Sequence, residues 1–194
     1  MELLDALRIG RWYNFYAMPP NSTDLDLFVL ALVQRGCATA YDFKSQAGIS
    51  VGSSAPVLDR LEKAGLIKGS SPGVRKRQQF SITKSGTKTL ESGWRDLLAS
   101  RPTDPDATLR ITYLAWALGG QSELSDFIDS SATTLKNAAA TRLAEANQLQ
   151  PMTGSLGGQA FRWLKSSFEA ARLDAQSVAL RELGKQIKKQ KRSK

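Results

Sequence analysis

The 194-residue chain contains no histidine and only one cysteine, and these two absences exclude much of ordinary enzyme chemistry. Without histidine, Ser-His-Asp and Cys-His catalysis are ruled out in their usual forms. Zinc sites of the finger and hydrolase types are ruled out as well. Cys37 has no partner for an intrachain disulfide, and we expect a small buried residue there in preference to a redox-sensing thiol. We therefore predict no enzyme activity, no catalytic residues, no metal site and no cofactor.

The chain also lacks long apolar runs and a basic N-terminus. No run approaches the ~20 residues that cross a bilayer. Glu2 and Asp5 stand where a secretory signal would carry positive charge. The composition, 41% hydrophobic and 23% charged, is typical of a globular protein. We expect a cytoplasmic protein with no membrane partner.

Positive charge is present, and it is concentrated in two parts of the chain. Residues 59–101 hold 10 basic and 4 acidic residues, whereas residues 185–194 hold 6 basic residues and no acidic one. The remaining segments, 1–58 and 102–184, carry net charges of −1 and −2. A local basic surface favours a polyanionic partner. For the tail, non-specific DNA affinity and a solvated, frayed end are equally good interpretations.

The expected elements follow the order of a winged helix-turn-helix. Apolar periodicity predicts helices at 24–35 and 41–47, then a third helix that starts at Ser50 or Ser53 and ends before Gly65. A strand at 66–68, a turn at 69–73, a strand at 74–82 and a helix from Thr83 to about 99 follow. Pro56 lies inside the third helix if that helix starts at Ser50, and in its first turn if it starts at Ser53.

This arrangement suits DNA binding. The second and third helices form the turn unit, and the third enters the major groove. Its first residues are small and polar, which permits a close approach to phosphates: Ser50, Gly52, Ser53 and Ser54. The wing, which the two strands and their turn form, carries three cations beside two glycines: Arg75, Lys76 and Arg77.

Helices also dominate the second half, so the predicted fold class is mainly α, with a two-stranded wing. We expect an N-terminal segment (1–22), a DNA-binding domain (23–100), a helical dimerisation or effector domain (104–187) and a basic disordered tail (188–194). A linker at 101–106 precedes helices at 109–118, 124–149 and 159–187. The last helix has an apolar stripe with spacings of 3, 4, 3, 4 and 3, typical of helices packed side by side: Phe161, Leu164, Phe168, Ala171, Ala175 and Val178.

Aromatic residues in this half form either a helical core or dimer seam, which we favour, or an effector pocket. A pocket at the seam would satisfy both interpretations. The candidate residues are Tyr113, Trp116, Phe161, Trp163 and Phe168.

Several segments, in this order and spacing, resemble the PadR family of transcription regulators. They are 27–32 (LFVLAL), 40–43 (AYDF), 48–53 (GISVGS), 56–67 (PVLDRLEKAGLI), 75–77 (RKR) and 83–86 (TKSG). The resemblance covers residues 24–99. It implies a homodimeric regulator of double-stranded DNA, usually a repressor, that dimerises through C-terminal helices and often responds to a small aromatic or hydrophobic effector.

The resemblance also assigns roles to individual residues. It implies that Tyr41, the start of the third helix and the exposed Arg60 lie at the DNA, together with the cations of the wing; Lys44 adds charge beside them. The chain departs from the family at Ala55, where a tyrosine is usual, and at Asp59, where a basic residue is frequent.

Two alternatives remain open. Ala55 and Asp59 favour a winged helix that has become a protein-interaction or dimerisation module and no longer binds DNA. Among regulators, a MarR-like protein would more often dimerise through helices from both ends of the chain, and the aromatic segment 1–17 is compatible with that.

Overall fold

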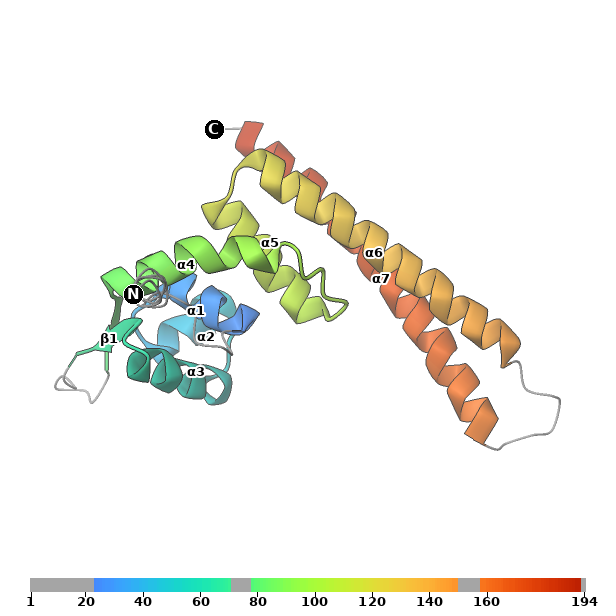
Figure 1. Cartoon of the computed structure of the whole chain (residues 1–194), viewed down its shortest axis with the longest axis horizontal. Coiled ribbons are helices and arrows are strands. Elements are labelled where there is room, and N and C mark those ends of the chain that lie inside the picture. Colours follow the sequence, from blue (N-terminus) through green and yellow to red (C-terminus); the bar gives the residue numbers. More distant parts are fainter. Residues whose placement is uncertain (1–22, 71–77, 150–157, 193–194) are drawn as a thin grey trace, which may run out of the picture. The chain divides into compact units, whose positions relative to one another are not determined.

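The computed structural model describes residues 23–70, 78–149 and 158–192, and it is mainly α with one two-stranded antiparallel sheet (Figure 1). The chain divides into two compact units, with the boundary between Leu97 and Leu98. The predicted fold class, a winged helix-turn-helix followed by helices, is confirmed. The expected segment 1–22 and the cations of the wing lie outside the described residues.

The first unit, called here the winged-helix unit, has the predicted order of elements. They are α1 (Asp24–Gln34), α2 (Ala40–Ala47), α3 (Val51–Lys63), β1 (Ile67–Gly69), β2 (Phe80–Ile82) and α4 (Lys84–Leu97). Capping boxes begin α1 and α2, because Thr23 pairs with Asp26 and Thr39 pairs with Asp42. Each box satisfies backbone N–H groups that the first helical turn leaves open.

Ser50 is the N-cap of α3, which decides the place of Pro56. Its hydroxyl accepts a hydrogen bond from the N–H of Ser53 at 3.1 Å. Pro56 therefore lies inside the helix. It has no N–H to donate to the carbonyl of Gly52 four residues earlier.

The core of the winged-helix unit is built around α1. Leu27, Val29 and Leu30 are fully buried, and Leu90 and Trp94 of α4 are buried as well. The sheet pairs Ile67 with Ile82 and Gly69 with Phe80, and the predicted common face of Phe80 and Ile82 is confirmed by the half-burial of both around an exposed Ser81. The N–H of Phe80 also donates to the carbonyl of Ala38 at 2.7 Å, so β2 is tied to the segment between α1 and α2.

The second unit, called here the C-terminal unit, consists of α5 (Pro105–Leu118), α6 (Gln121–Gln148) and α7 (Gly158–Arg192). The predicted linker, residues 101–106, extends too far, because α5 already starts at Pro105. The Asp104 side chain accepts from the N–H of Ala107 at 2.8 Å, and Pro105 occupies the first helical position.

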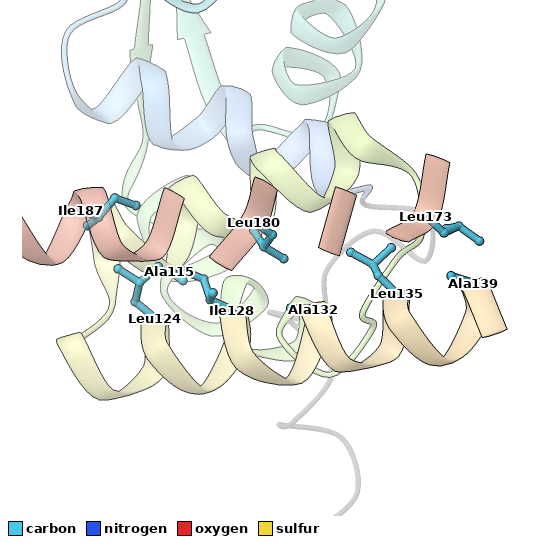
Figure 2. Close-up of a cluster of buried hydrophobic side chains, with 9 residues drawn as sticks. All are labelled: Ala115, Leu124, Ile128, Ala132, Leu135, Ala139, Leu173, Leu180 and Ile187. Atoms are coloured by element: carbon cyan, nitrogen blue, oxygen red, sulfur yellow. The ribbon is translucent and has the colours of Figure 1, made fainter. Parts of the chain in front are cut away.

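Helices α6 and α7 pack antiparallel along a seam of small and large residues on α7. The Ser177 hydroxyl donates to the carbonyl of Ala132 at 2.7 Å, and a Cβ on Gly184 would lie 3.1 Å from Cδ1 of Ile128. The seam residues of α7 are spaced 3, 4, 3, 4 and 3, with a small residue at every seventh position: Ala170, Leu173, Ser177, Leu180, Gly184 and Ile187. Three of them join the apolar cluster that α5 and α6 complete (Figure 2).

This seam is not the predicted one. The predicted stripe of α7 points away from α6, and Phe161, Leu164, Phe168 and Val178 are 68%, 56%, 71% and 54% exposed. A periodic apolar stripe shows that a face packs but not against which partner, and α7 has two such faces on opposite sides.

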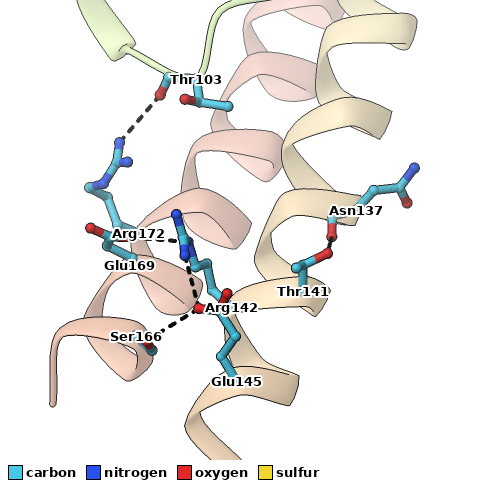
Figure 3. Close-up of polar contacts among 8 residues, drawn as sticks. All are labelled: Thr103, Asn137, Thr141, Arg142, Glu145, Ser166, Glu169 and Arg172. Atoms are coloured by element: carbon cyan, nitrogen blue, oxygen red, sulfur yellow. Dashed lines mark hydrogen bonds and ion pairs between the residues drawn. The ribbon is translucent and has the colours of Figure 1, made fainter. Parts of the chain in front are cut away.

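Polar contacts join the last turns of α6 to the first turns of α7 (Figure 3). Arg142 of α6 pairs with Glu145 at 2.8 Å and with Glu169 of α7 at 3.1 Å. The hydrogen bond from Arg142 lowers the pKa of Glu145. These side chains are at least partly exposed, so we expect the pairs to favour the observed pairing of the helices more than to add stability.

Gly86 of α4 lies against the backbone of Leu66, the residue before β1. A Cβ on Gly86 would lie 2.0 Å from the carbonyl oxygen of Leu66, which also accepts from the N–H of Thr83 at 3.0 Å. We expect Gly86→Ala to lower the free energy of unfolding by about 2 kcal/mol or more, because backbone must move. Gly52→Ala is the control, since its Cβ would meet only the Ser50 hydroxyl at 3.9 Å. Urea unfolding followed by circular dichroism measures both, and equal decreases would contradict the predicted close contact.

Candidate nucleic-acid interface

The connection between α2 and α3 is a short, fixed turn. Gly48 ends α2 in the left-handed region, with a φ of 68°. The N–H of Ile49 then donates to the carbonyl of buried Phe43 at 3.1 Å, and Ser50 caps α3. These local interactions fix the turn, and together with the ion pair between Arg60 of α3 and Asp26 of α1 they set the direction of α3.

Helix α3 buries one face and exposes the other. Val57, Leu58 and Leu61 enter the core, and the opposite side carries exposed Gly52, Ala55, Pro56, Asp59 and Lys63. Apart from Val51, which is 50% exposed, the exposed side chains of the first six residues of α3 are therefore small. A helix with this profile can approach another backbone closely.

The predicted contact residues of α3 do not all lie on this face. Ser50, Gly52 and Ser53 are exposed, as a contact role requires. Ser54 is fully buried, and its hydroxyl donates to the carbonyl of Val51 at 3.3 Å. The structure therefore places Ser54 in the core and not at the surface, because it lies on the same helical stripe as buried Val57, Leu58 and Leu61.

Arg60, the predicted exposed cation of α3, is bound within the unit. Its guanidinium forms an ion pair with the carboxylate of Asp26, whose side chain is only 3% exposed. The other carboxylate oxygen of Asp26 accepts from the N–H of Thr23 at 2.8 Å. Arg60 remains 48% exposed, so it lies at the surface while it links α3 to the start of α1.

A groove of about 420 Å³ runs between the start of α2, the exposed side of α3 and β2. Tyr41, which is 62% exposed, lies on one wall, and Ala55 and Asp59 lie on another. Glu62, also at the groove, accepts from the N–H of Gly69 at 2.9 Å and so ties α3 to β1. Lys44 is exposed on α2.

Two exposed cations near this face were not singled out from the sequence. Lys63 is the last residue of α3, and Lys68 points outward from β1. The excess of positive charge in residues 59–101 includes both, but only the structure shows that they lie beside the groove-lining elements. The three cations of the wing, Arg75 to Arg77, lie outside the described residues.

The aromatic residues proposed for a seam or pocket fall into two groups within the C-terminal unit. Tyr113 and Trp116 of α5 stack edge to face, with ring centroids 6.3 Å apart, and line a pocket of about 240 Å³ with the end of α7. Phe161, Trp163 and Phe168 belong to the first part of α7, ~20 Å or more along the helix. One chain therefore does not gather all five into one pocket.

Cys37 is 4% exposed, which confirms the prediction of a buried residue. Its thiol donates to Oε1 of Gln46 at 3.3 Å. Burial, and secondly the charge of Asp42, raise the pKa of the thiol, which opposes thiolate reactivity. Among the described residues, no helix is long and apolar enough to cross a membrane, and no cluster of three metal-ligating side chains occurs.

Comparison with known proteins gives a weak structural likeness. No family model and no curated protein matches the chain. Among solved structures, the chain is similar to Bacillus subtilis PadR in a crystal structure with operator DNA, at 20% identity and a TM-score of 0.36. The match covers 84% of this chain and 97% of the other. At these values it decides neither the family nor the function, and the interface is argued from the geometry above.

The ion pair between Asp26 and Arg60 predicts a measurable coupling. We expect Arg60→Ala to lower the free energy of unfolding by about 2 kcal/mol, because it leaves a buried carboxylate with fewer partners. Asp26→Asn combined with Arg60→Ala should cost less than the two single changes added together. A double-mutant cycle in urea measures this difference. Additive effects would show that the pair contributes no coupling energy.

Proposed function

We propose that the chain is a sequence-specific DNA-binding regulator that acts as a dimer. The observation that carries the proposal is the presentation of α3. A short capped turn leads into the helix, and the exposed face of the helix carries mainly small side chains. A two-stranded sheet follows it. This is the combination with which a winged helix inserts α3 into the major groove and places its wing along the phosphates.

The contact residues are proposed in two groups. Tyr41, Ser50, Gly52 and Ser53 lie at the exposed start of α2 and α3 and approach the DNA closely. Charge comes from Lys44, from the exposed part of Arg60 and from the wing, Arg75, Lys76 and Arg77. Ser54 is left out of the contact set, because its side chain is buried.

The second apolar face of α7 supports a homodimer. This face, called here the open stripe, consists of Phe161, Leu164, Phe168, Ala171, Ala175 and Val178, and all six are exposed. Its length along the helix is ~26 Å. A second copy of the same stripe matches it in length and spacing, as a two-fold symmetric contact requires. Two chains paired in this way would offer two recognition helices to half-sites about one DNA turn apart.

Repression and control by a small effector follow from the PadR resemblance. The pocket beside Tyr113 and Trp116 supports the effector part, since it is apolar, aromatic and of a size for a small ring compound. It lies on α5 and α7, and α7 is also the helix of the open stripe. An effector there would act on the paired state through that helix.

A protein-interaction module is the second candidate. The observation that favours it is the groove beside α3, whose described lining includes Asp59 and Glu62 and no cation. Such a groove is poorly suited to phosphate and better suited to a basic or neutral segment. The two candidates differ in one measurable property, the binding of arbitrary duplex DNA at low salt.

A salt titration tests the DNA-binding proposal. We expect the chain to bind a random-sequence duplex with an affinity that falls steeply as salt rises, because counterions are released. Arg75→Ala with Arg77→Ala should lower the slope of log K against log salt by about 0.9 for each phosphate that the variant no longer neutralises. Fluorescence anisotropy of a labelled duplex measures both.

The matched control removes the same charge from the C-terminal unit, with Lys136→Ala and Arg181→Ala, both exposed. Its slope should stay close to that of the unchanged chain. An unchanged slope in the wing variant would contradict the wing assignment. Absence of binding at low salt would contradict DNA binding altogether and favour the interaction module.

The open stripe predicts the oligomeric state. Leu164→Glu should weaken self-association by about 3 kcal/mol, which is more than 100-fold in Kd, because a charge enters an apolar seam. Leu143→Glu is the control, since Leu143 is 54% exposed on α6 and lies outside the stripe. Sedimentation equilibrium should find a dimer for the unchanged chain and for Leu143→Glu. A monomeric unchanged chain would rule out the proposed dimer.

A further inference from the structure

The exposed face of α3 has very few groups that can hydrogen-bond to a base. Gly52, Ala55 and Pro56 have no polar side-chain atoms, and Pro56 also lacks an N–H. The hydroxyl of Ser53 lies 2.8 Å from the hydroxyl of the capping residue Ser50. Arg60 is turned toward Asp26. The polar side chains that remain lie in the second half of the helix and are Asp59 and Lys63.

These two side chains form an exposed donor–acceptor pair. Nζ of Lys63 lies 2.7 Å from Oδ2 of Asp59, one helical turn apart, and the side chains are 76% and 63% exposed. An exposed pair at this spacing contributes little to stability. Asp59 also lines the groove between α3, α2 and β2, together with Tyr41 and Ala55. The packing of the described residues does not require a carboxylate at this position.

We propose that Asp59 is the base-reading residue of the recognition helix and that it selects cytosine. The inference rests on the proposed function, since it requires α3 to lie in the major groove. Cytosine presents an N4 amine there, and a carboxylate can only accept. Guanine and thymine present acceptors in the major groove, which a carboxylate repels. Adenine has an N6 amine, but its N7 acceptor lies beside the amine and opposes a negative charge.

Lys63 completes the recognition of the base pair. Guanine opposite the cytosine presents O6 and N7 as acceptors, and a lysine ammonium donates to them. The adjacent acceptor and donor of Asp59 and Lys63 therefore match the adjacent donor and acceptor of one C·G pair. The salt bridge also offsets the repulsion between Asp59 and phosphates, because the two charges approach the DNA together.

The experiment is a selection from a pool of random-sequence duplexes, carried out with the full chain and followed by sequencing. We expect the unchanged chain to enrich a motif with a C·G pair in each half-site, favoured over other pairs by about 5- to 150-fold. Asp59→Asn should change that position to adenine, because an amide both donates and accepts and suits the N6 and N7 of adenine. Asp59→Ala should remove the preference there and leave the other positions of the motif.

Asp96→Asn is the matched control, since Asp96 is an exposed aspartate on α4 of the same unit. All three variants lose one negative charge, so a general gain in affinity should be common to them, and only the Asp59 variants should change the motif. An identical motif from the unchanged chain, Asp59→Asn and Asp59→Ala would overturn the role of Asp59 while DNA binding stands. Failure of the unchanged chain to enrich any sequence would overturn the proposed function, and the inference with it.

Discussion

The buried carboxylate of Asp26 is the constraint on which the presentation of α3 depends. One of its oxygens closes the capping box of α1, and the other holds the guanidinium of Arg60 on α3. A carboxylate that is 3% exposed is costly to bury unless both oxygens are satisfied, so the start of α1 and the last turn of α3 are held together. The same interaction holds the guanidinium of Arg60 beside Asp26 and leaves this side chain only 48% exposed. The helix that would meet DNA is thereby left with a face of small residues and a single acid–base pair.

The two apolar faces of α7 differ in the size of their side chains, and this difference suits two kinds of contact. The face toward α6 uses Ala170, Ser177 and Gly184 to bring the two backbones close, with larger residues filling the space between them. The opposite face has larger side chains and no covering element among the described residues of its own unit. Close backbone packing suits a permanent hairpin, whereas protruding side chains suit a contact between separately folded chains.

Most elements were predictable because their signals are local. The apolar periodicity, the serines at the start of α3, Gly65 after it and Thr83 before α4 placed the helices of the winged-helix unit to within a residue or two. The pairing of Asp26 with Arg60 was not predictable, because the two residues are 34 positions apart and no single-element pattern relates them. Ser54 was misplaced for a related reason, since a run of small polar residues does not show which of them faces the core. The small residues at 170, 177 and 184 are visible in the sequence. The prediction nevertheless followed the stripe of larger apolar residues on the opposite side of the same helix.

Pairing through the open stripe would also make the occupancy of DNA depend steeply on the concentration of the protein. If two copies must meet before both half-sites are filled, then occupancy of DNA at low concentration rises with the square of the amount of protein. A modest change in synthesis would then produce a steeper change in occupancy, without any effector. An exposed row of phenylalanine and leucine favours non-specific association of a monomer. In the proposed dimer the same row would be buried, and the fraction buried would rise with protein concentration.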